Sequence, residues 1–275
     1  MTKCRLYVWI AWVSVGLALV LSRCGPPEVQ PAPPAAPPRT LAPPMPALPA
    51  LRVGLAPQYP PIAFTQEGRV TGLEVDCARG VAGELGRQVT FIELDWDALI
   101  PALEAGQIDV IMSGMSITDA RAQRVWFVSP YLQVGQMAIY RKGDDLLAAS
   151  PTLLTMTRRR VGVVAGTTGA AYVHSHLPQA QVVPFASADA GLQALRVGEI
   201  DVFVHDAVTA WRIGDPEAHE TVTSSFSPLT EEYLAWAVRT TDTALHRDLE
   251  AVLERWRRSG RLQELLQRWL RFRVG

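Results

Sequence analysis

The stretch ALEAGQIDV at residues 102–110 recurs as ALRVGEIDV at residues 194–202. Each copy is typical of a helix end, a capping glycine, an acidic turn and a buried strand. A second echo lies upstream, because RVG at residues 52–54 recurs at residues 160–162, each time at the start of an apolar segment. Helix–glycine–strand units are common in α/β proteins, so turn chemistry alone could produce these echoes. The match over nine positions favours two lobes of similar α/β build.

Segments typical of strands and of helices alternate at short spacing around these copies. This alternation predicts α/β lobes with mostly parallel sheets. An amphipathic helical segment over residues 245–270, interrupted at Gly260, closes the chain. The expected strands are residues 52–56, 88–94, 108–112, 161–164 and 202–204, and the expected helices are residues 77–85 and 98–104.

The N-terminal residues are typical of an export signal. Lys3 and Arg5 precede an apolar run over residues 6–21, which predicts a signal peptide, and we expect residues 1–23 to be removed. The run also reaches the lower length for spanning a bilayer, so an uncleaved anchor helix stays open. Both alternatives export the rest of the chain, and we expect it in the periplasm or another extracytoplasmic compartment.

The sequence LSRCG at residues 21–25 resembles the lipobox of bacterial lipoproteins, in which the cysteine is acylated. Cys24 is therefore the expected lipidation site and membrane anchor. Arg23 stands where the lipobox has glycine, alanine or serine, so a plain signal anchor or a soluble secreted protein remain alternatives. Residues 26–49 hold 11 of the 21 prolines and favour an extended chain, so we expect residues 24–50 to be a tether.

The composition excludes some classes of function. Removing residues 1–23 leaves 23 basic and 27 acidic residues, a net charge of −4. The interior has no long basic run, so sequence-independent nucleic-acid binding is excluded. With Cys24 as the anchor, Cys77 is alone in the mature body, and no intramolecular disulfide is possible there. We expect packing to supply the stability, and we expect no cofactor.

Two clusters of candidate ligand-binding residues follow predicted strands in the first half of the chain. Residues 59–64 contain paired prolines that fix a loop and two aromatic rings that offer flat faces. Residues 113–121 contain a glycine that lets the backbone approach a ligand, hydroxyl groups, and an arginine that can grip a carboxylate with two hydrogen bonds. The candidates are Tyr59, Phe64, Ser113, Gly114, Ser116, Thr118 and Arg121.

Two further clusters follow predicted strands in the second half. The first is expected to open a helix, whose free N–H groups favour an anion, and the second supplies a carboxylate that can hold an ammonium group. Because all four clusters follow strands, they lie at carboxyl ends, where open α/β sheets bind ligands. One cation, one anion and aromatic walls are together complementary to a zwitterion. The candidates are Gly166, Thr167, Thr168, His205 and Asp206.

The sequence lacks the motifs of common catalytic sites. It has no Gly-x-Ser-x-Gly elbow, no Walker loop and no zinc signature. His174 and His176 are two residues apart without a carboxylate-rich partner, so a surface pair is favoured over a metal site. We therefore expect no catalytic residue and no metal.

The chain resembles the family 3 bacterial extracellular solute-binding proteins, the polar amino-acid receptors of ABC importers, from about residue 51 to residue 270. This resemblance implies a two-lobed periplasmic binding protein-like II fold, a Venus flytrap with two hinge crossings. We expect lobe 1 to comprise residues 51–139 and 238–275, and lobe 2 to comprise residues 140–237. The motifs that carry the resemblance are Tyr59-Pro60-Pro61, Gly72-Leu73-Glu74-Val75-Asp76, residues 111–121, Phe127-Val128-Ser129-Pro130-Tyr131, Gly166-Thr167-Thr168 and His205-Asp206.

The resemblance also implies roles for particular residues. Arg121 and the region of Thr168 would hold the α-carboxylate of a bound amino acid. The backbone at Gly114, the Ser116 hydroxyl and the Asp206 carboxylate would hold its α-ammonium group. Ligand binding would close the lobes about the hinge, and an inner-membrane ABC permease would recognise the closed monomer. The walls around the ligand side chain would be Tyr59 and Trp96.

Two departures from the family pattern bear on the ligand. Receptors for lysine, arginine or histidine usually carry an acidic residue where Ala56 stands, which argues against a basic ligand. A lysine of glutamine-type receptors is replaced by Val164, whereas the His205-Asp206 pair is similar to the glutamine-type pattern. We expect a polar uncharged amino acid, with glutamine favoured.

Two other functions stay open. The fold also resembles that of periplasmic cyclohexadienyl or arogenate dehydratases, for which His205 or Glu74 would be the candidate acid. A ligand-sensing module that reports to a separate receptor is the third alternative. Otherwise Glu74 is expected to mark a helix start, and Asp109 and Asp201 are expected to cap turns.

Overall fold

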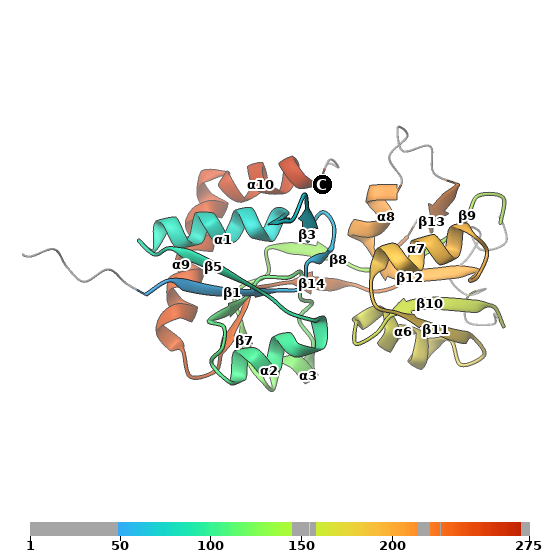
Figure 1. Ribbon diagram of the computed structural model, residues 1–275, viewed down its shortest axis with the longest axis horizontal. Helices are drawn as coiled ribbons and strands as arrows, with labels where there is room; N and C mark the ends of the chain where they lie inside the picture. Colours follow the sequence, from blue (N-terminus) through green and yellow to red (C-terminus); the bar gives the residue numbers. More distant parts are fainter. Residues whose placement is uncertain (1–48, 145–153, 155–157, 214–220, 226, 271–275) are drawn as a thin grey trace, which may run out of the picture. The chain divides into compact units, whose positions relative to one another are not determined.

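The computed structural model describes residues 49–144, 154, 158–213, 221–225 and 227–270. The chain divides into two compact units, residues 1–45 and residues 46–275, and the second unit is described here by itself. It contains two five-stranded sheets, each covered by helices, and we call the part built on each sheet a lobe (Figure 1). No helix among the described residues is long and apolar enough to cross a membrane.

The first lobe is built on a mixed sheet with the strand order β5-β1-β6-β15-β7. Strand β1 runs parallel to β5 and β6, whereas β15 runs antiparallel to β6 and β7. The strands are β1 (Leu51–Leu55), β5 (Val89–Glu93), β6 (Val110–Ile111), β7 (Val125–Phe127) and β15 (Ala237–Arg239).

The second lobe repeats this arrangement with the order β11-β10-β12-β9-β13. Strand β10 runs parallel to β11 and β12, and β9 runs antiparallel to β12 and β13. Position by position, the pattern of parallel and antiparallel neighbours is that of the first sheet. The strands are β9 (Gln136–Arg141), β10 (Arg160–Val164), β11 (Gln181–Phe185), β12 (Val202–Asp206) and β13 (Val222–Ser224).

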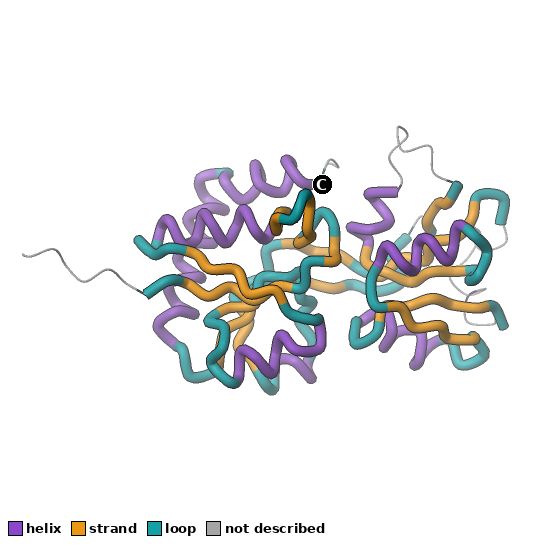
Figure 2. Tube along the Cα trace, in the orientation of Figure 1, coloured by secondary structure: helices purple, strands orange, loops and turns teal. Residues whose placement is uncertain are grey.

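Helices lie against both sheets, as the tube in Figure 2 shows for each lobe. The first lobe has α1 (Leu73–Glu84), the short 3-10 helix η1 (Trp96–Ala98), α2 (Leu99–Glu104), α3 (Asp119–Ala122), α9 (Thr243–Ser259) and α10 (Arg261–Trp269). The second has α6 (Thr168–His176), α7 (Ala188–Arg196) and α8 (Ala207–Ile213).

The chain crosses between the lobes twice, and the two crossings pair with each other. Strand β8 (Leu132–Val134) leads directly into β9 of the second sheet, and β14 (Glu232–Leu234) leads back towards β15 of the first. These two strands form an antiparallel pair. A small antiparallel sheet of β2 (Gln58–Tyr59), β3 (Ala63–Gln66) and β4 (Arg69–Thr71) follows β1, and the Pro60-Pro61 peptide bond within it is cis.

The repeated RVG and Ile-Asp motifs form the same ion pair in both lobes. Asp109 accepts hydrogen bonds from the backbone N (2.9 Å), Nε (3.2 Å) and Nη2 (2.6 Å) of Arg52. Asp201 accepts from the same three atoms of Arg160, at 3.0, 3.1 and 2.7 Å. The two carboxylates therefore anchor the start of a strand instead of capping a turn, and the Arg160 guanidinium lowers the pKa of Asp201 to about 2.

The glycine of each RVG motif also has the same packing reason. A Cβ at Gly54 would lie 2.3 Å from the Ile108 side chain, and a Cβ at Gly162 would lie 2.4 Å from that of Ile200. The sequence echo is thus an echo of tertiary contacts, which turn chemistry alone would not produce.

The largest core cluster of the first lobe lies between its sheet and helices α1, α9 and α10, and a second cluster lies around α2. Trp236 and Trp256 are both fully buried there and meet edge to face, with ring centroids 6.1 Å apart. The second lobe has an apolar cluster on either face of its sheet, around Phe203 and around Val173. Gly260 separates α9 from α10 with a φ of 81°, the left-handed conformation expected of a helix-ending glycine.

The sheets are less parallel than predicted, because each has two parallel and two antiparallel pairs of neighbouring strands. The predicted helices and strands themselves differ from the structure mainly at their ends. The helix predicted at residues 77–85 begins at Leu73, because Leu73 and Val75 already face the core. The strand predicted at residues 108–112 is restricted to Val110–Ile111, although Ile108 and Met112 are fully buried. The helix predicted at residues 98–104 is preceded by the 3-10 turn at Trp96.

Candidate ligand-binding site

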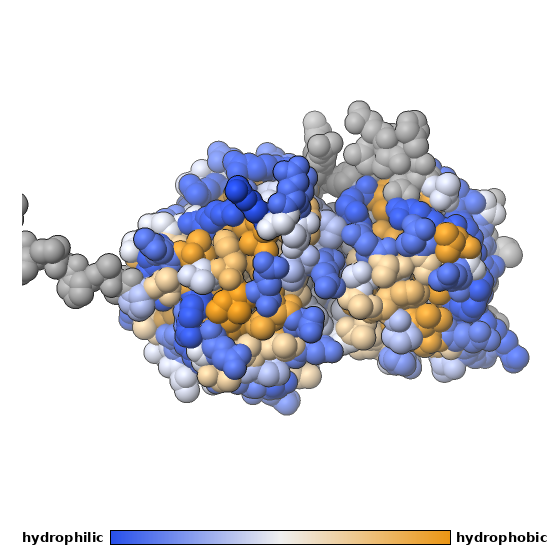
Figure 3. All heavy atoms as spheres, viewed as in Figure 1, coloured by the Kyte–Doolittle hydropathy of each residue, from blue (hydrophilic) through white to orange (hydrophobic). Residues whose placement is uncertain are grey.

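A cavity of about 450 Å³ lies between the lobes of the described unit. It is bounded by segments that follow β1, β5 and β6 in the first lobe and β10, β11 and β12 in the second. In the space-filling view most spheres along this junction are blue or pale (Figure 3). The predicted site residues that line the cavity are Tyr59, Trp96, Ser113, Gly114, Ser116, Arg121, Thr167, Thr168, His205 and Asp206.

Three predicted site residues do not line this cavity. Phe64 packs edge to face against Trp269, with centroids 6.1 Å apart. Thr118 caps the N-terminus of α3, where its hydroxyl accepts a hydrogen bond from the Arg121 backbone. Gly166 lies just outside and contributes its carbonyl oxygen to a contact between the lobes. Phe64 and Thr118 therefore lie outside the cavity lining, and their side chains serve a packing contact and a helix cap.

Arg121 brings a positive charge to the cavity. Its guanidinium lies over the Trp96 ring, 5.3 Å from the centroid, and donates from Nη1 to the Ser116 carbonyl at 2.9 Å and from Nη2 to the Gly166 carbonyl at 3.3 Å. Among the described residues, no carboxylate lies within 4 Å of it. Burial lowers the pKa of Arg121, while Asp206 and Glu232 act in the opposite direction. Arginine remains protonated in such surroundings, so the charge is available to an anion.

Helix α6 adds to the anion-binding character of this region. The Thr167 side chain caps the helix, accepting from the Ala170 N–H at 3.3 Å and donating to the Val164 carbonyl at 2.7 Å. The first N–H groups of a helix have no acceptor within it, and the helix dipole favours negative charge there. Thr168, the first residue of α6, lines the cavity, so this end of the helix lies at the site.

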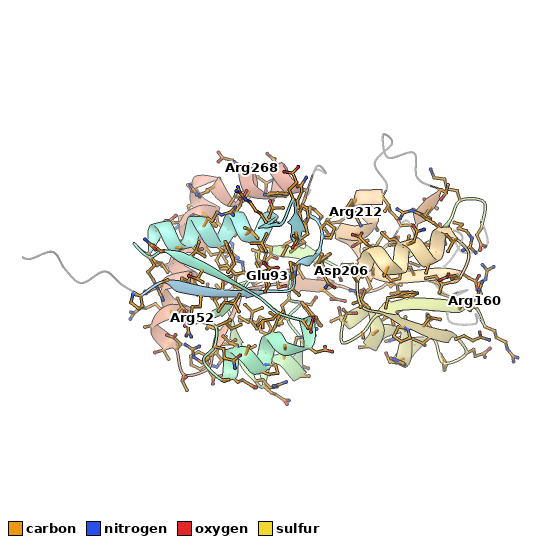
Figure 4. The ribbon with its side chains drawn as sticks, viewed as in Figure 1. Arg52, Glu93, Arg160, Asp206, Arg212 and Arg268 are labelled. Carbon is orange, nitrogen blue, oxygen red and sulfur yellow. The ribbon has the colours of Figure 1, made fainter. Side chains whose placement is uncertain are left out.

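Asp206 brings a negative charge to the same cavity. It ends β12, and in Figure 4 it lies where the two lobes face each other, whereas Arg52 and Arg160 lie towards the remote ends. Its Oδ1 accepts a short hydrogen bond from Gln136 Nε2. Burial is the largest influence on the pKa of Asp206 and raises it, and the nearby Glu232 raises it further. A cation from a ligand would reverse this destabilisation of the carboxylate.

Two rings shape the wall beside Asp206. Tyr59 meets His205 edge to face at 5.4 Å, and its buried hydroxyl faces Asp206 without a hydrogen bond of good geometry. His205 stacks on Phe203 and its Nδ1 lies 2.9 Å from the Thr209 hydroxyl. Burial lowers the pKa of His205, which favours the neutral ring.

The backbone conformation at residue 114 and the lack of room for a side chain both require glycine there. Its φ of 70° is in the left-handed region, and a Cβ there would lie 2.9 Å from Tyr59 and from Ile62. The neighbouring Ser113 hydroxyl is occupied, because it accepts from the Ala56 backbone N–H at 2.9 Å.

Sequence reasoning missed several residues near the cavity. Gln58, Asp95, Phe185 and Ser187 line it. Glu232 accepts a hydrogen bond from the Ser116 hydroxyl, although 116 positions separate them in the sequence. None of these residues belongs to a short motif, so only the folded chain brings them to the site. Cys24 lies outside the described residues, and His176 is engaged with Tyr172, its ring stacking on the tyrosine at 4.5 Å.

The fold and this cavity define a two-lobed protein with a charged cleft between its lobes, and comparison with known proteins agrees. The sequence matches the family described as bacterial extracellular solute-binding proteins, family 3, over residues 51–272. The chain therefore belongs to this family.

Named relatives are binding proteins. A probable histidine-binding protein of Neisseria gonorrhoeae is 31% identical over 265 residues, covering 95% of this chain and 94% of the relative. Another from Campylobacter jejuni subsp. jejuni is 34% identical over 160 residues, which span 58% of this chain and 61% of the relative's length. These names support a solute-binding protein without enzymatic activity.

A solved structure shows the same fold. It is a putative binding component of an ABC transporter from Wolinella succinogenes, complexed with lysine. It superposes with a TM-score of 0.77 at 29% identity and covers 80% of this chain and 95% of that one. The two-lobed architecture predicted from the sequence is confirmed by this similarity.

Proposed function

We propose that this chain is the extracytoplasmic substrate-binding protein of an ABC importer and that it binds an amino acid between its lobes. One observation carries the proposal: the guanidinium of Arg121, without a carboxylate partner among the described residues, and the carboxylate of Asp206 line a single cavity. A small molecule with one anionic and one cationic end matches that pair of charges. The cavity therefore favours a zwitterion over a singly charged ligand.

The α-carboxylate is assigned to Arg121 and to the backbone N–H of Thr168. Arginine matches a carboxylate with two parallel hydrogen bonds, and the start of α6 adds favourable partial charge. The α-ammonium group is assigned to Asp206 and the Ser116 hydroxyl, with the Gly114 backbone beside them. Tyr59 and Trp96 are assigned to the walls around the ligand side chain.

The ligand side chain is directed to the part of the cavity lined by Gln58, Leu94, Phe185 and Ser187. Amide, hydroxyl and apolar groups there suit a polar uncharged side chain such as that of glutamine. Ala56, which lies in the same lining, offers no charge. The sequence analysis also favoured a polar uncharged amino acid.

A basic amino acid is the second candidate, and one observation favours it. Asp95 is an exposed carboxylate that lines the cavity, and it could pair with a guanidinium, ammonium or imidazolium group. The relatives named for histidine and the structure complexed with lysine point the same way. Asp95→Asn separates the candidates, because it should weaken arginine or histidine binding about tenfold and change glutamine binding little.

Closure of the lobes is proposed as the step that couples binding to transport. In this structure the first lobe reaches the second at Gly166, whose carbonyl accepts from Trp96 Nε1 at 3.1 Å and from Arg121. Contacts available only in the closed form supply the differential affinity that shifts the population. An ABC permease is the proposed partner of the closed monomer.

The N-terminal region and the lobe bounds complete the proposal. Residues 1–23 act as a signal peptide, Cys24 carries the lipid, and residues 24–50 form the tether. The lobe bounds predicted from the sequence, residues 51–139 with 238–275 and residues 140–237, are adjusted by a few residues, because β9 of the second sheet begins at Gln136 and β15 of the first begins at Ala237. Metabolic labelling with palmitate tests the anchor: labelling that persists in Cys24→Ser would remove the lipid from this position.

Calorimetry against the free amino acids tests the function. The expected result is saturable binding of one amino acid by wild-type protein, with binding weakened by Arg121→Ala by about 2–5 kcal/mol. Arg124→Ala is the matched control, because Arg124 is exposed and paired with Glu104 at 2.6 Å. The proposal fails if no amino acid binds, or if the two variants behave alike.

A further inference from the structure

Two polar side chains sit at the points where the chain crosses between the lobes. Gln136 is the first residue of β9, directly after the first crossing, and Glu232 is the first residue of β14, on the second. Gln136 is 1% exposed and Glu232 is 9% exposed. Neither lines the cavity, yet both contact residues that do.

The Glu232 carboxylate accepts hydrogen bonds from hydroxyl groups in three segments of the chain. Its Oε2 accepts from the Ser116 hydroxyl of the first lobe at 2.7 Å and from the Thr168 hydroxyl of the second lobe at 2.7 Å. Its Oε1 accepts from the Thr230 hydroxyl at 2.9 Å. A hydroxyl has one proton to donate, so these three are committed to the carboxylate.

Gln136 completes the arrangement from the other crossing. Its Nε2 donates to the Thr168 hydroxyl oxygen at 3.1 Å and to Asp206 Oδ1. A side-chain amide nitrogen carries two protons, and both are used here. Its backbone N–H donates to the Thr230 hydroxyl at 2.9 Å, which joins the two crossings.

The consequence concerns what the site can offer to a ligand. The hydroxyl groups of Ser116 and Thr168 already donate their protons to Glu232, so they can only accept hydrogen bonds from a molecule in the cavity. Hydroxyl oxygens that can only accept hydrogen bonds stabilise a ligand ammonium group and repel a ligand carboxylate. The carboxylate is then left to Arg121 and to backbone N–H groups.

We propose that Glu232 and Gln136 are positioning residues that hold the Ser116 and Thr168 hydroxyls as acceptors for a ligand ammonium group. They act from the crossings and do not touch the ligand. The role rests on the proposed function, since it concerns the same cavity. It also assigns the Thr168 hydroxyl to the ammonium group, whereas the family resemblance placed the region of Thr168 as a whole with the carboxylate.

Glu232→Gln tests the role with little change in shape. The amide can present N–H groups to the two hydroxyls, which would then turn their protons towards the cavity and oppose the ammonium group. Glu231→Gln is the matched control, because Glu231 is the adjacent residue and bonds to the Tyr233 hydroxyl and to Gln133 instead. Circular-dichroism melting of both variants reports on folding.

The probes are the amino acid that wild-type protein binds in calorimetry and its 2-hydroxy acid analogue, which keeps the carboxylate and lacks the ammonium group. We expect Glu232→Gln to weaken the amino acid at least tenfold, and the analogue, measured by competition, less than threefold. Glu231→Gln should change neither. A merely structural role for Glu232 would weaken both probes equally.

Gln136→Leu gives a second route if Glu232→Gln does not fold. It removes the donor to Asp206 and to Thr168, and the same selective loss of the amino acid is expected. Equal loss of both probes in each folded variant, or binding unchanged from that of Glu231→Gln, overturns the positioning role. Failure of wild-type protein to bind any amino acid instead removes the proposed function, so the two failures are distinct.

Discussion

A buried carboxylate beneath the cavity makes stability depend on pH in an unusual direction. Glu74, in the first turn of α1, is 0% exposed and neither of its oxygens has a hydrogen bond of good geometry. The Tyr131 hydroxyl and the Gly114 N–H face it and moderate the cost, and Tyr59 and Cys77 are its other titratable neighbours. Burial nevertheless raises the pKa of Glu74 from 4.5 to about 8.

The sign follows from proton counting. Between pH 4.5 and about 8 the folded protein keeps a proton on Glu74 that the unfolded chain has lost. The free energy of unfolding therefore falls as pH rises through this range, by up to about 1.4 kcal/mol for each pH unit. Over the full shift this amounts to roughly 5 kcal/mol, most of it lost by pH 8.

Glu74→Gln should abolish this dependence, because an amide of nearly the same shape does not ionise. Urea unfolding of both proteins at pH 5, 7 and 8.5 gives the difference in the free energy of unfolding. We expect that difference to move in favour of Glu74→Gln by roughly 3.5–4 kcal/mol from the lowest to the highest pH, because a small part of the effect is already present at pH 5. Glu93→Gln, an exposed change at the end of β5 in the same lobe, is the control and should leave the wild-type slope unaltered. Parallel pH profiles for wild type and Glu74→Gln would refute the reasoning.

Three further changes test other parts of the structure. Arg121→Lys keeps the charge but loses the fork, so calorimetry should show about tenfold to hundredfold weaker binding; equal affinity would mean that the planar geometry is unused. Gly166→Ala would place a Cβ 2.2 Å from a carboxylate oxygen of the other lobe, so ligand affinity should fall about tenfold, whereas Gly198→Ala, with a similar φ and open space, should leave affinity unchanged. Gly54→Ala and Gly162→Ala should each lower the free energy of unfolding by about 1–3 kcal/mol, because each Cβ meets an isoleucine side chain; denaturant titration checks this, and a neutral effect in either lobe would contradict the shared packing.

Local chemistry made part of this architecture predictable. The glycine after a helical segment and the apolar strand behind it mark the same unit in both lobes, and the structure shows Gly106 and Gly198 in the left-handed conformation. That Arg121 and Asp206 line one cavity was predictable, because Asp206 ends a strand, Arg121 follows one, and the carboxyl ends of parallel strands converge. Helix and strand ends were less predictable, because burial of neighbours such as Leu73 extends an element beyond its local signals.

The rest of the site depends on contacts between distant parts of the chain. Glu232 reaches Ser116 across 116 positions, and Gln136 reaches Asp206 across 70, so no local pattern indicates either. Phe64 was chosen as part of an aromatic loop motif, but its ring is used to pack against Trp269. A motif fixes which residues are near each other along the chain, and only packing decides which of them turn inward.

The position of β15 has a consequence for how the chain is made. This strand lies between β6 and β7 in the first sheet, yet it follows the whole second lobe in the sequence. The first sheet therefore keeps an unfilled slot until residue 239 is available, while the second lobe's strands are complete by residue 224. A nascent or partly translocated chain can finish its inserted half before the half that encloses it, and a chain cut short before β15 leaves two exposed strand edges that invite aggregation.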